Sequence, residues 1–451
     1  MRTISLHDTR TGAVRALEPE QPGHVRIYAC GPTVYGRIHV GNARPFVVFS
    51  LLKRFLAHEG HQVTFVANVT DINDKIYKAA RRLGVDSTEL AAEMTAAYVA
   101  DTDLLGLGRP DHEPLASETI GPIIELIERL IEGDHAYEVQ GDVYFSVRSY
   151  PEYGELSHRQ IDRMDQGEDS EEADRKRDPL DFALWKAHKP TEDSAWDSPW
   201  GRGRPGWHIE CSAMAEQLLG VDFEIHGGGS DLLFPHHENE AAQTRAARGR
   251  PLAQLWVHNG MVRLDSAKMA KSVGNVFALH EALASYGRDA LLMYFAGGHY
   301  RQPIEFDHDR LSEARARTQR FREAARGLIP GSSPPWSASL RERFFDALAR
   351  DFNTPEALAA ASDWIREANR SGPGKVGDAD LREMLGVLGL ENLLDVEAAE
   401  ASPEALELLS ARERARAIRD FQEADRLRDQ LRELGWVVRD GPAGPELLPL
   451  S

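Results

Sequence analysis

Two cysteines, a histidine and a glutamate form the first group of residues whose types could do chemistry. Cys30 and Cys211 are the only cysteines in the chain, too few for a disulfide framework, and the plainest alternative for each is a buried core thiol. His236 and Glu240 are four residues apart on an expected helix, which places imidazole and carboxylate on one face. Together the four side chains suit a tetrahedral zinc ion, provided that the tertiary fold gathers them. His237 is the nearest competing ligand, but on a regular helix it would point about 100° away from His236.

A second group of residues suits polyphosphate chemistry. His39-Val-Gly-Asn42 begins an expected helix, where the positive end of the helix dipole attracts phosphate. Lys268-Met-Ala-Lys271-Ser follows a later expected strand and places two lysines three residues apart, where they could neutralise charge on a departing pyrophosphate. Each pattern alone also fits a helix cap or a surface lysine pair. The two patterns together favour nucleotide chemistry.

Two other phosphate-binding patterns are excluded. Gly201-Arg-Gly-Arg-Pro-Gly206 matches the dinucleotide pattern G-x-G-x-x-G, but Ser-Pro-Trp precedes it where a strand is required. The chain contains no G-x-x-x-x-G-K-[ST], so it has no P-loop. The sequence therefore argues against NAD binding and against a P-loop nucleotidase.

The elements that must position these residues alternate between strand and helix. Such alternation predicts an α/β fold with parallel strands and right-handed crossovers. We expect strands at residues 25–29, 62–69, 222–225 and 255–262, and helices at residues 41–58 and 235–248.

Two further regions surround this α/β pattern. Residues 115–207 contain an acidic run at 165–174 and a Pro/Gly/Trp-rich stretch, and we expect them to form an insertion into the nucleotide-binding fold. After about residue 310 the chain is rich in Ala, Glu, Arg and Leu at helical spacing. The breaks at 331–335 and 372–374 divide this part into separate helices.

Composition limits the class of protein. The 451 residues, 42% apolar and 28% charged, fit an ordinary globular chain of about three domains. A net charge of -19 argues against broad nonspecific binding of nucleic acid. Arginine-rich segments at 309–326 and 411–432 could still present local basic faces, although charge alone favours solvated helix surfaces with internal ion pairs. No apolar stretch is long enough to cross a membrane and no secretory signal is evident, so we expect a cytoplasmic protein.

Several longer motifs identify a family. The chain closely resembles class I cysteinyl-tRNA synthetases nearly from end to end. The resemblance rests on the following motifs: Tyr28-Ala-Cys-Gly-Pro-Thr-Val-Tyr35, His39-Val-Gly-Asn42-Ala-Arg, Asn68-Val-Thr-Asp-Ile-Asn-Asp-Lys75, Pro179-Leu-Asp-Phe-Ala-Leu-Trp-Lys186, Gly206-Trp-His-Ile-Glu-Cys-Ser-Ala-Met214, His226-Gly-Gly-Gly-Ser-Asp-Leu232, Phe234-Pro-His-His-Glu-Asn-Glu240 and Lys268-Met-Ala-Lys-Ser272.

The resemblance implies an activity. It implies ATP-dependent activation of L-cysteine to cysteinyl-adenylate, with Mg²⁺ accompanying ATP, and transfer of cysteine to the 3′ end of tRNA(Cys). It also implies one zinc ion per chain that takes the substrate thiolate as a further ligand, no editing domain and no membrane partner. We further expect a monomer.

The resemblance also implies roles for individual residues. The metal ligands are Cys30, Cys211, His236 and Glu240. The catalytic residues are His39, Asn42, Lys268 and Lys271. The residues that bind the amino acid are Thr70, Trp207 and Asp231, and those that bind ATP are Gly41, Gly227, Gly228, Gly229 and Lys271, with residues 227–229 in a loop.

The implied fold is a Rossmann-like catalytic domain with an insertion, an α-helical C-terminal region and a small terminal anticodon-binding module. The expected parts are the first catalytic half (1–114), the insertion (115–207), the second catalytic half (208–254), a stem-contact region with the lysine motif (255–310), a helical bundle (311–400) and the anticodon-binding module (401–451).

The sequence departs from the family pattern at three places. Asn42 replaces a histidine, and its amide can still donate to phosphate. Ala270 replaces the middle serine of the lysine motif, and Pro445 stands where the family commonly has threonine. Two alternative functions stay open: a mycothiol-pathway ligase that joins cysteine to an amino sugar and lacks the anticodon-binding end, and a non-catalytic tRNA-binding paralogue.

Overall fold

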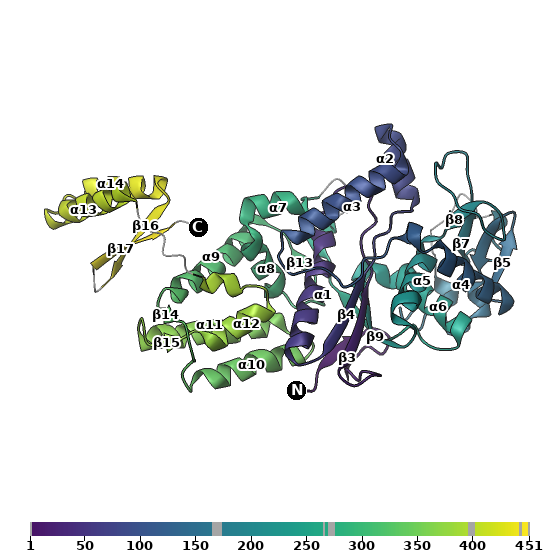
Figure 1. The fold of residues 1–451 in the computed structure, drawn as a ribbon, viewed down its shortest axis with the longest axis horizontal. Helices are drawn as coiled ribbons and strands as arrows, with labels where there is room; N and C mark the ends of the chain where they lie inside the picture. The colour runs from purple at the N-terminus through teal and green to yellow at the C-terminus, as the bar shows by residue number, and fades with distance from the viewer. Residues whose placement is uncertain are drawn as a thin grey trace.

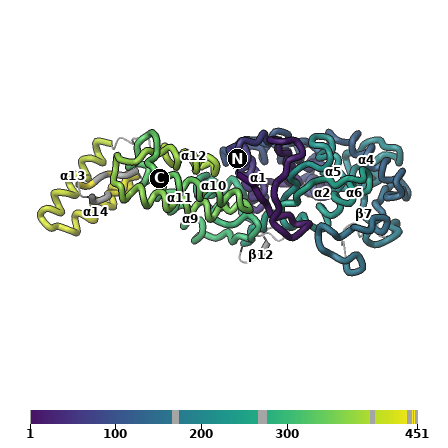
Figure 2. Tube along the Cα trace, turned by 90° about the horizontal axis from the view of Figure 1, so that it is seen from below, coloured from purple at the N-terminus to yellow at the C-terminus, as the bar shows by residue number. Residues whose placement is uncertain are grey.

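The chain forms an elongated molecule around a central sheet. The computed structural model describes residues 2–164, 174–264, 267–268, 276–395, 402–441 and 444–449. The C-terminal residues 402–449 lie at one end of the molecule and residues 120–205 at the other, with the sheet between them (Figure 1, Figure 2). In the described ranges, no helix combines the length and apolar composition needed to span a bilayer.

The central sheet has four parallel strands in the order β10-β9-β3-β4. They are β3 (His24–Ala29), β4 (Gln62–Ala67), β9 (Phe223–Gly229) and β10 (Ala253–Asn259). The helix α1 (Val40–His58) joins β3 to its neighbour β4, which confirms the expected βαβ unit. Since β3 pairs with β4 on one side and with β9 on the other, the two distant halves of the chain meet at β3. The carboxyl ends of all four strands lie at one edge, where α/β sheets bind ligands.

Two expected strands have different bounds in the structure. The glycine run after residues 222–225 is part of β9 and not a loop, because its backbone continues the pairing with β3 and β10. The strand expected at 255–262 is instead β10 followed by β11 (Val262–Leu264). Gly260 lies between them, where a Cβ atom would be 2.3 Å from the backbone carbon of Gln302 and would prevent this close approach.

The helix α1 begins at a capping box and packs closely on the sheet. The His39 ring accepts a hydrogen bond from the Asn42 backbone N (3.3 Å), and Asn42 Oδ1 accepts one from the His39 backbone N (3.2 Å). Further along, the Phe49 ring lies against β9. A Cβ atom on Gly227 would be 2.2 Å from this ring, so glycine permits the helix to approach the strand.

Two helices follow β4 on the way to the insertion. They are α2 (Asp74–Leu83), capped by the Asn73 side chain, and α3 (Ser87–Asp103), capped by the Asp86 side chain. Gly84 ends α2 in the left-handed conformation at φ 72°, which favours glycine.

The insertion is a four-stranded antiparallel sheet with its own apolar core. It contains α4 (Ile120–Glu132), β5 (Ala136–Val139), β6 (Asp142–Phe145), β7 (Phe182–Ala187) and β8 (Gly203–Pro205). The rejected dinucleotide pattern falls on β8 and not on a βα turn of the parallel sheet. Of the acidic run, residues 165–173 lie outside the described residues.

Buried ion pairs fix the insertion against α2. The Arg204 guanidinium is 3% exposed and donates to Asp74 Oδ1 (2.6 Å) and Glu192 Oε1 (2.9 Å). Lys186 Nζ lies 3.4 Å from the other Asp74 oxygen. The first residue of α2 therefore connects the insertion to the central domain.

After the insertion the chain returns to the central sheet through α5 (Trp207–Leu219), β9, α6 (Glu238–Arg248) and β10. A small sheet then contains β11, β12 (Ala267–Lys268) and β13 (Ile304–Glu305) in the order β12-β11-β13. The boundary expected at 254/255 falls inside β10.

The C-terminal third is mainly helical, as expected. Its elements are α7 (Leu279–Tyr286), α8 (Arg288–Gly297), α9 (His308–Ala325), β14 (Leu328–Ile329), α10 (Ser337–Ala349), α11 (Thr354–Ser371), β15 (Val376–Gly377) and α12 (Ala379–Val387). The breaks predicted at 331–335 and 372–374 lie between helices α9 and α10 and between α11 and α12.

Two small units stand at the ends of the chain, and the N-terminal one packs on the central sheet, because Thr9 N donates to Trp256 O of β10 (2.9 Å). The C-terminal unit contains α13 (Pro403–Ala417), α14 (Phe421–Glu433), β16 (Trp436–Gly441) and β17 (Gly444–Pro449). The N-terminal hairpin consists of β1 (Ser5–Asp8) and β2 (Ala13–Ala16).

Candidate active site

The four predicted metal ligands converge. The candidate ligand atoms of Cys30, Cys211, His236 and Glu240 all lie within 4.8 Å of one another, and all four residues are buried. Cys30 Sγ is 3.6 Å from His236 Nε2 and 3.5 Å from Glu240 Oε1. His236 Nε2 is 3.1 Å from the same Glu240 oxygen. Side chains separated by up to 210 residues in the sequence thus meet at one point.

The parallel sheet brings these four residues together. Cys30 directly follows β3, and its backbone N donates to Gly227 O of β9 (3.0 Å). Cys211 lies in the second turn of α5, whereas Glu240 lies in the first turn of α6. Because strands end and helices begin at this edge of the sheet, residues from both halves of the chain face one small volume.

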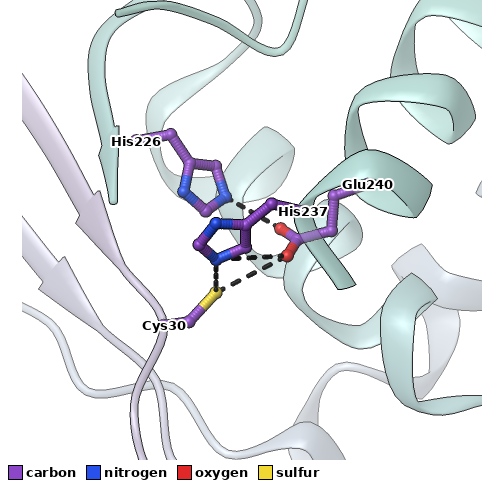
Figure 3. A group of neighbouring side chains, drawn as sticks. All are labelled: Cys30, His226, His237 and Glu240. Carbon is purple, nitrogen blue, oxygen red and sulfur yellow. Dashed lines mark hydrogen bonds and ion pairs between the residues drawn. The ribbon is translucent and has the colours of Figure 1, made fainter. Parts of the chain in front are cut away.

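A second group of ligand atoms overlaps the first. Cys30, His226, His237 and Glu240 also lie within 4.8 Å of one another and are buried (Figure 3). His237 Nε2 is 3.3 Å from Cys30 Sγ, so the expectation that His237 points away from the site is wrong. The reason is local: the expected helix starts at Glu238, and residues 233–237 form a π turn with an extended Phe234 (φ −139°, ψ 132°). The 100° rule of an α-helix does not apply there.

Burial controls the charge of the metal-ligand group. Burial raises the pKa of the Cys30 thiol well above its usual value, and the Cys211 thiol adds to this shift. Burial also lowers the pKa of His236 to about 3, which keeps its ring neutral at pH 7. Burial opposes ionisation of Glu240, but the imidazoles of His226 and His236 outweigh it and hold the pKa of that carboxyl below its usual value. The group thus offers a neutral imidazole, a carboxylate and two thiols that a cation would deprotonate.

Four further histidines surround the predicted ligands. His208 Nδ1 lies 2.9 Å from His236 Nδ1, and His226 Nε2 lies 2.8 Å from Glu240 Oε2. His237 Nδ1 lies 2.7 Å from His258 Nε2, whose ring in turn contacts Thr9 Oγ1 at 2.7 Å. Outer hydrogen bonds of this kind orient metal ligands and fix their tautomers.

The predicted amino-acid residue Thr70 lies next to this cluster. The loop after Cys30 is paired with the segment around Thr70, because Val34 N donates to Thr70 O (3.2 Å) and Thr70 N donates to Pro32 O (3.1 Å). Asn68 Nδ2 donates to the Thr70 hydroxyl (3.2 Å). Thr70 itself is only 2% exposed, so its side chain is buried beside the segment that follows Cys30.

Trp207 and Asp231 lie on two other sides. The Trp207 indole stacks on His236, and Lys75 Nζ lies 5.8 Å from the centroid of the Trp207 ring. Asp231 is exposed in a short turn after β9. Of the residues predicted to bind the amino acid, Trp207 thus contacts a predicted metal ligand directly, whereas Asp231 lies in the turn that follows β9.

The predicted phosphate-binding residues lie at the start of α1. The capping box uses Oδ1 of Asn42, which leaves the Nδ2 amide of this exposed side chain as the group that can donate to a phosphate. The backbone on both sides of His39 pairs with the chain that follows the lysine motif: Val40 N donates to Phe277 O (3.0 Å) and Leu279 N donates to Ile38 O (3.1 Å).

The lysine motif is only partly described. Lys268 ends β12, and its backbone is paired with Arg263 of β11. Ala270 and Lys271 lie outside the described residues. Phe277 and Leu279, which follow the motif in the sequence, lie beside the start of α1.

The sequence did not identify the outer histidines or Lys75 as site residues. His208, His226 and His237 stand inside the family motifs, but no spacing rule separates an outer partner from a core histidine. His258 and Lys75 meet the site only through the packing of β10 and α2. Contact in the folded chain was the only signal that could have found them.

Two protein-family models match parts of this chain. The catalytic domain of class I (C) tRNA synthetases matches residues 16–316, and the cysteinyl-tRNA ligase anticodon-binding domain matches residues 398–444. The parallel sheet, the insertion and the two signature motifs accordingly define a class I aminoacyl-tRNA synthetase.

Relatives narrow this class to one family. Cysteine–tRNA ligases from Halorhodospira halophila and Alkalilimnicola ehrlichii are each 47% identical to this chain, over 98% of this chain and 98% of the relative. The cysteine–tRNA ligase of Pseudothermotoga lettingae is 44% identical with the same coverage. The chain belongs to the cysteine–tRNA ligase family.

Solved structures agree on the fold. A Mycobacterium tuberculosis methionyl-tRNA synthetase in complex with methionyl-adenylate has a TM-score of 0.60 at 15% identity, covering 86% of this chain and 94% of that one. The leucyl-tRNA synthetase of an Agrobacterium radiobacter ternary complex with tRNA has a TM-score of 0.61 at 12% identity, covering 84% of each chain.

Proposed function

We propose that this chain activates L-cysteine with ATP to cysteinyl-adenylate and transfers cysteine to the 3′ end of tRNA(Cys). The observation that carries the proposal is the buried cluster of two cysteines, a histidine and a glutamate beneath Trp207. The anticodon-binding domain match at residues 398–444 favours tRNA as the acceptor over an amino sugar.

We propose further that Cys30, Cys211, His236 and Glu240 hold one zinc ion. Their donor atoms converge, their imidazole is neutral and their burial excludes water, so the residues fit this metal. The overlapping set that contains His226 and His237 is less suitable, because it supplies one sulfur instead of two. In addition, His208 and His226 already act as outer partners of His236 and Glu240.

Selection of cysteine over serine is the task of this cluster. An apolar pocket separates close isosteres by only ~10 to 200-fold. A bound zinc ion would supply a preference for a thiolate over a hydroxyl. Trp207, stacked on His236, and the buried Thr70 would hold the amino acid so that its side chain faces the cysteines, with Asp231 at the open side.

Adenylate formation would take place at the start of α1. The positive end of the α1 dipole at Gly41 and the side-chain amide of Asn42 favour an anionic α-phosphate, with His39 beside them. Lys268 and Lys271 would stabilise the departing pyrophosphate of Mg²⁺-ATP. Gly227, Gly228 and Gly229, which carry no side chains, would lie beside the nucleotide at the end of β9.

The other parts of the molecule would serve the tRNA. We propose the division into a split catalytic domain (1–114 and 208–254), an insertion (115–207), a stem-contact region (255–310), a helical bundle (311–400) and an anticodon-binding module (401–451). We propose that a single chain carries out both steps of the reaction.

The decisive experiment measures ATP–pyrophosphate exchange and tRNA charging with the full chain. We expect exchange with cysteine, background exchange with serine, and cysteinylation of purified tRNA(Cys). Cysteine-dependent exchange with product formed only on glucosaminyl-inositol would instead establish the mycothiol-pathway ligase. Exchange at background with cysteine present would favour the tRNA-binding paralogue.

A further inference from the structure

One face of α2 carries a basic stripe that the proposed chemistry does not use. Lys75, Lys78 and Arg82 are exposed and are spaced at i, i+3 and i+7, which puts them within about 60° of one another around the helix. The opposite face of α2 is buried through Ile76 and Tyr77. In Figure 1, α2 projects above the central sheet.

The stripe has no acidic partners in the described part of the chain. No ion pair joins Lys75, Lys78 or Arg82 to a carboxylate of a described residue. The only acid at the start of the helix, Asp74, is already paired with Arg204 and Lys186 on the side of the insertion. A chain with a net charge of -19 thus presents three adjacent uncompensated cations on one exposed face.

The stripe begins at the active site. Lys75 Nζ lies 5.8 Å from the ring centroid of Trp207 and 5.9 Å from that of Tyr35. Trp207 stacks in turn on His236, so Lys75 is separated from the predicted metal ligands by one aromatic ring. Both rings are half-buried, and Lys75 itself is exposed.

We propose that the face of α2 formed by Lys75, Lys78 and Arg82 binds the single-stranded 3′ end of the tRNA and directs its terminal ribose to the adenylate. The inference rests on the proposed function. Cations next to aromatic rings are the recurring means of holding a single strand, since phosphates pair with the charges and bases stack on the rings. The stripe extends about 10 Å from Lys75 to Arg82 at ~1.5 Å per residue, long enough to contact more than one phosphate.

The exposure of these residues favours the tRNA over the smaller substrates. Groups that bind cysteine are buried, as Thr70 and the predicted metal ligands are. The tRNA is a polyanion that binds from solvent, so its contacts should lie at the exposed border of the site. Lys75 is exposed beside Trp207, and Lys78 and Arg82 follow it along the same face of α2. Arg81 faces elsewhere, since its guanidinium donates to the carbonyl of Thr191 in the insertion (2.8 Å).

The test separates the two half-reactions in the full chain. Lys75→Met, Lys75→Arg and the double variant Lys78→Met/Arg82→Met are compared with Lys375→Met, which changes an exposed lysine before β15. ATP–pyrophosphate exchange without tRNA measures adenylate formation. Single-turnover transfer from preformed cysteinyl-adenylate to tRNA(Cys) measures the second step. Thermal melting should show no loss of folding, because all altered side chains are exposed.

We expect Lys75→Met to slow transfer about 10-fold more than it slows exchange, as for loss of one charge-assisted hydrogen bond. Lys75→Arg should recover most of the transfer rate. The double variant should raise KM for tRNA. It should also reduce the slope of log KM against log salt concentration by about 1.4, the value expected when two phosphate contacts to a single strand are lost. Lys375→Met should change nothing.

Two results would overturn the inference. Exchange that falls as much as transfer would show that α2 serves the adenylate, and variants that all behave like Lys375→Met would show that the stripe has no role. If the parent chain showed no cysteine-dependent ATP–pyrophosphate exchange, the proposed function itself would be wrong, which is a separate outcome from the two above.

Discussion

The indole of Trp207 stacks on the imidazole of His236, with ring centroids 4.3 Å apart and planes inclined by 18°. Trp207 is the first residue of α5, and Cys211 follows it on the same helix. One helix therefore provides both a sulfur of the metal-ligand group and the aromatic surface that covers its histidine. Displacing α5 would alter metal binding and the amino-acid pocket together.

Trp207→Leu should weaken cysteine binding and leave the metal in place. A stacked aromatic pair contributes about 0.5–1.5 kcal/mol, so we expect KM for cysteine in ATP–pyrophosphate exchange to rise about 2- to 10-fold. Trp207→Phe, which retains a ring, is the matched control and should stay near the parent. If elemental analysis showed that Trp207→Leu had lost its zinc, Trp207 would be needed for metal binding as well as for cysteine binding, which would contradict the prediction.

Cys211→Ser should lower zinc content and raise the ratio of serine to cysteine activation, because it removes one of two sulfur donors. His237→Gln provides the comparison, since His237 belongs only to the overlapping ligand set. We expect this variant to keep its zinc. Zinc-edge absorption of the parent should show two protein sulfur ligands. The opposite pattern, with zinc lost from His237→Gln and kept by Cys211→Ser, would assign the metal to the other set.

Gly227→Ala should destabilise the fold. A Cβ atom there would lie 2.2 Å from the Phe49 ring and 2.5 Å from the carbonyl oxygen of Val257, so α1 or β10 must move. Overpacking of this kind costs about 1–3 kcal/mol. Gly121→Ala in α4 is the control, because nothing lies within 4 Å of its added atom. Chemical denaturation measures the free energy of unfolding of both variants. Equal midpoints would show that the close approach of Phe49 to Gly227 is not required for stability.

Asp74→Asn should destabilise the docking of the insertion in a pH-dependent way. Burial opposes ionisation of Asp74, but Arg204 and Lys186 outweigh it and lower the pKa of this carboxyl. A group with a lowered folded pKa stabilises the protein above its unfolded pKa, here ~3.9, and this contribution disappears as pH falls through the folded pKa.

The variant should accordingly be less stable than the parent by about 1 kcal/mol at pH 7, since the buried Arg204 loses a charged partner whose carboxylate is 45% exposed and partly screened by water. The difference should shrink as the pH falls from ~3.9, where the unfolded carboxyl becomes protonated, through the lowered pKa of the folded carboxyl. Urea unfolding at pH 7 and pH 3.5 measures it. A difference that is the same at both pH values would exclude the ion pair as its source.

Lys271→Ala should lower the rate of adenylate formation far more than the affinity for cysteine. The expected role is stabilisation of charge in the transition state, which affects kcat and not ground-state binding. Single-turnover adenylation measures the rate, and equilibrium dialysis with labelled cysteine measures the affinity. An unchanged rate would remove Lys271 from the mechanism.

Local sequence patterns were sufficient for most of the fold. The period of apolar residues and the glycines that follow helices predicted the βαβ unit at β3, α1 and β4, the insertion and the helical C-terminal region. Errors occurred where partners distant in the sequence decide the backbone. The glycine run at 227–229 has no strand propensity, yet it continues β9 because β3 and β10 pair with it on both sides.

The sequence by itself identified the candidate side chains for the chemistry: the lone cysteines, the histidine and glutamate four residues apart, and the two motifs suited to phosphate. Only the tertiary structure decided that the four candidate metal ligands meet and which neighbours they have. His237 illustrates the reason, because its direction depends on a π turn and on the approach of Cys30 from another strand. Contacts between distant segments depend on how the strands assemble, and spacing along the chain does not encode that assembly.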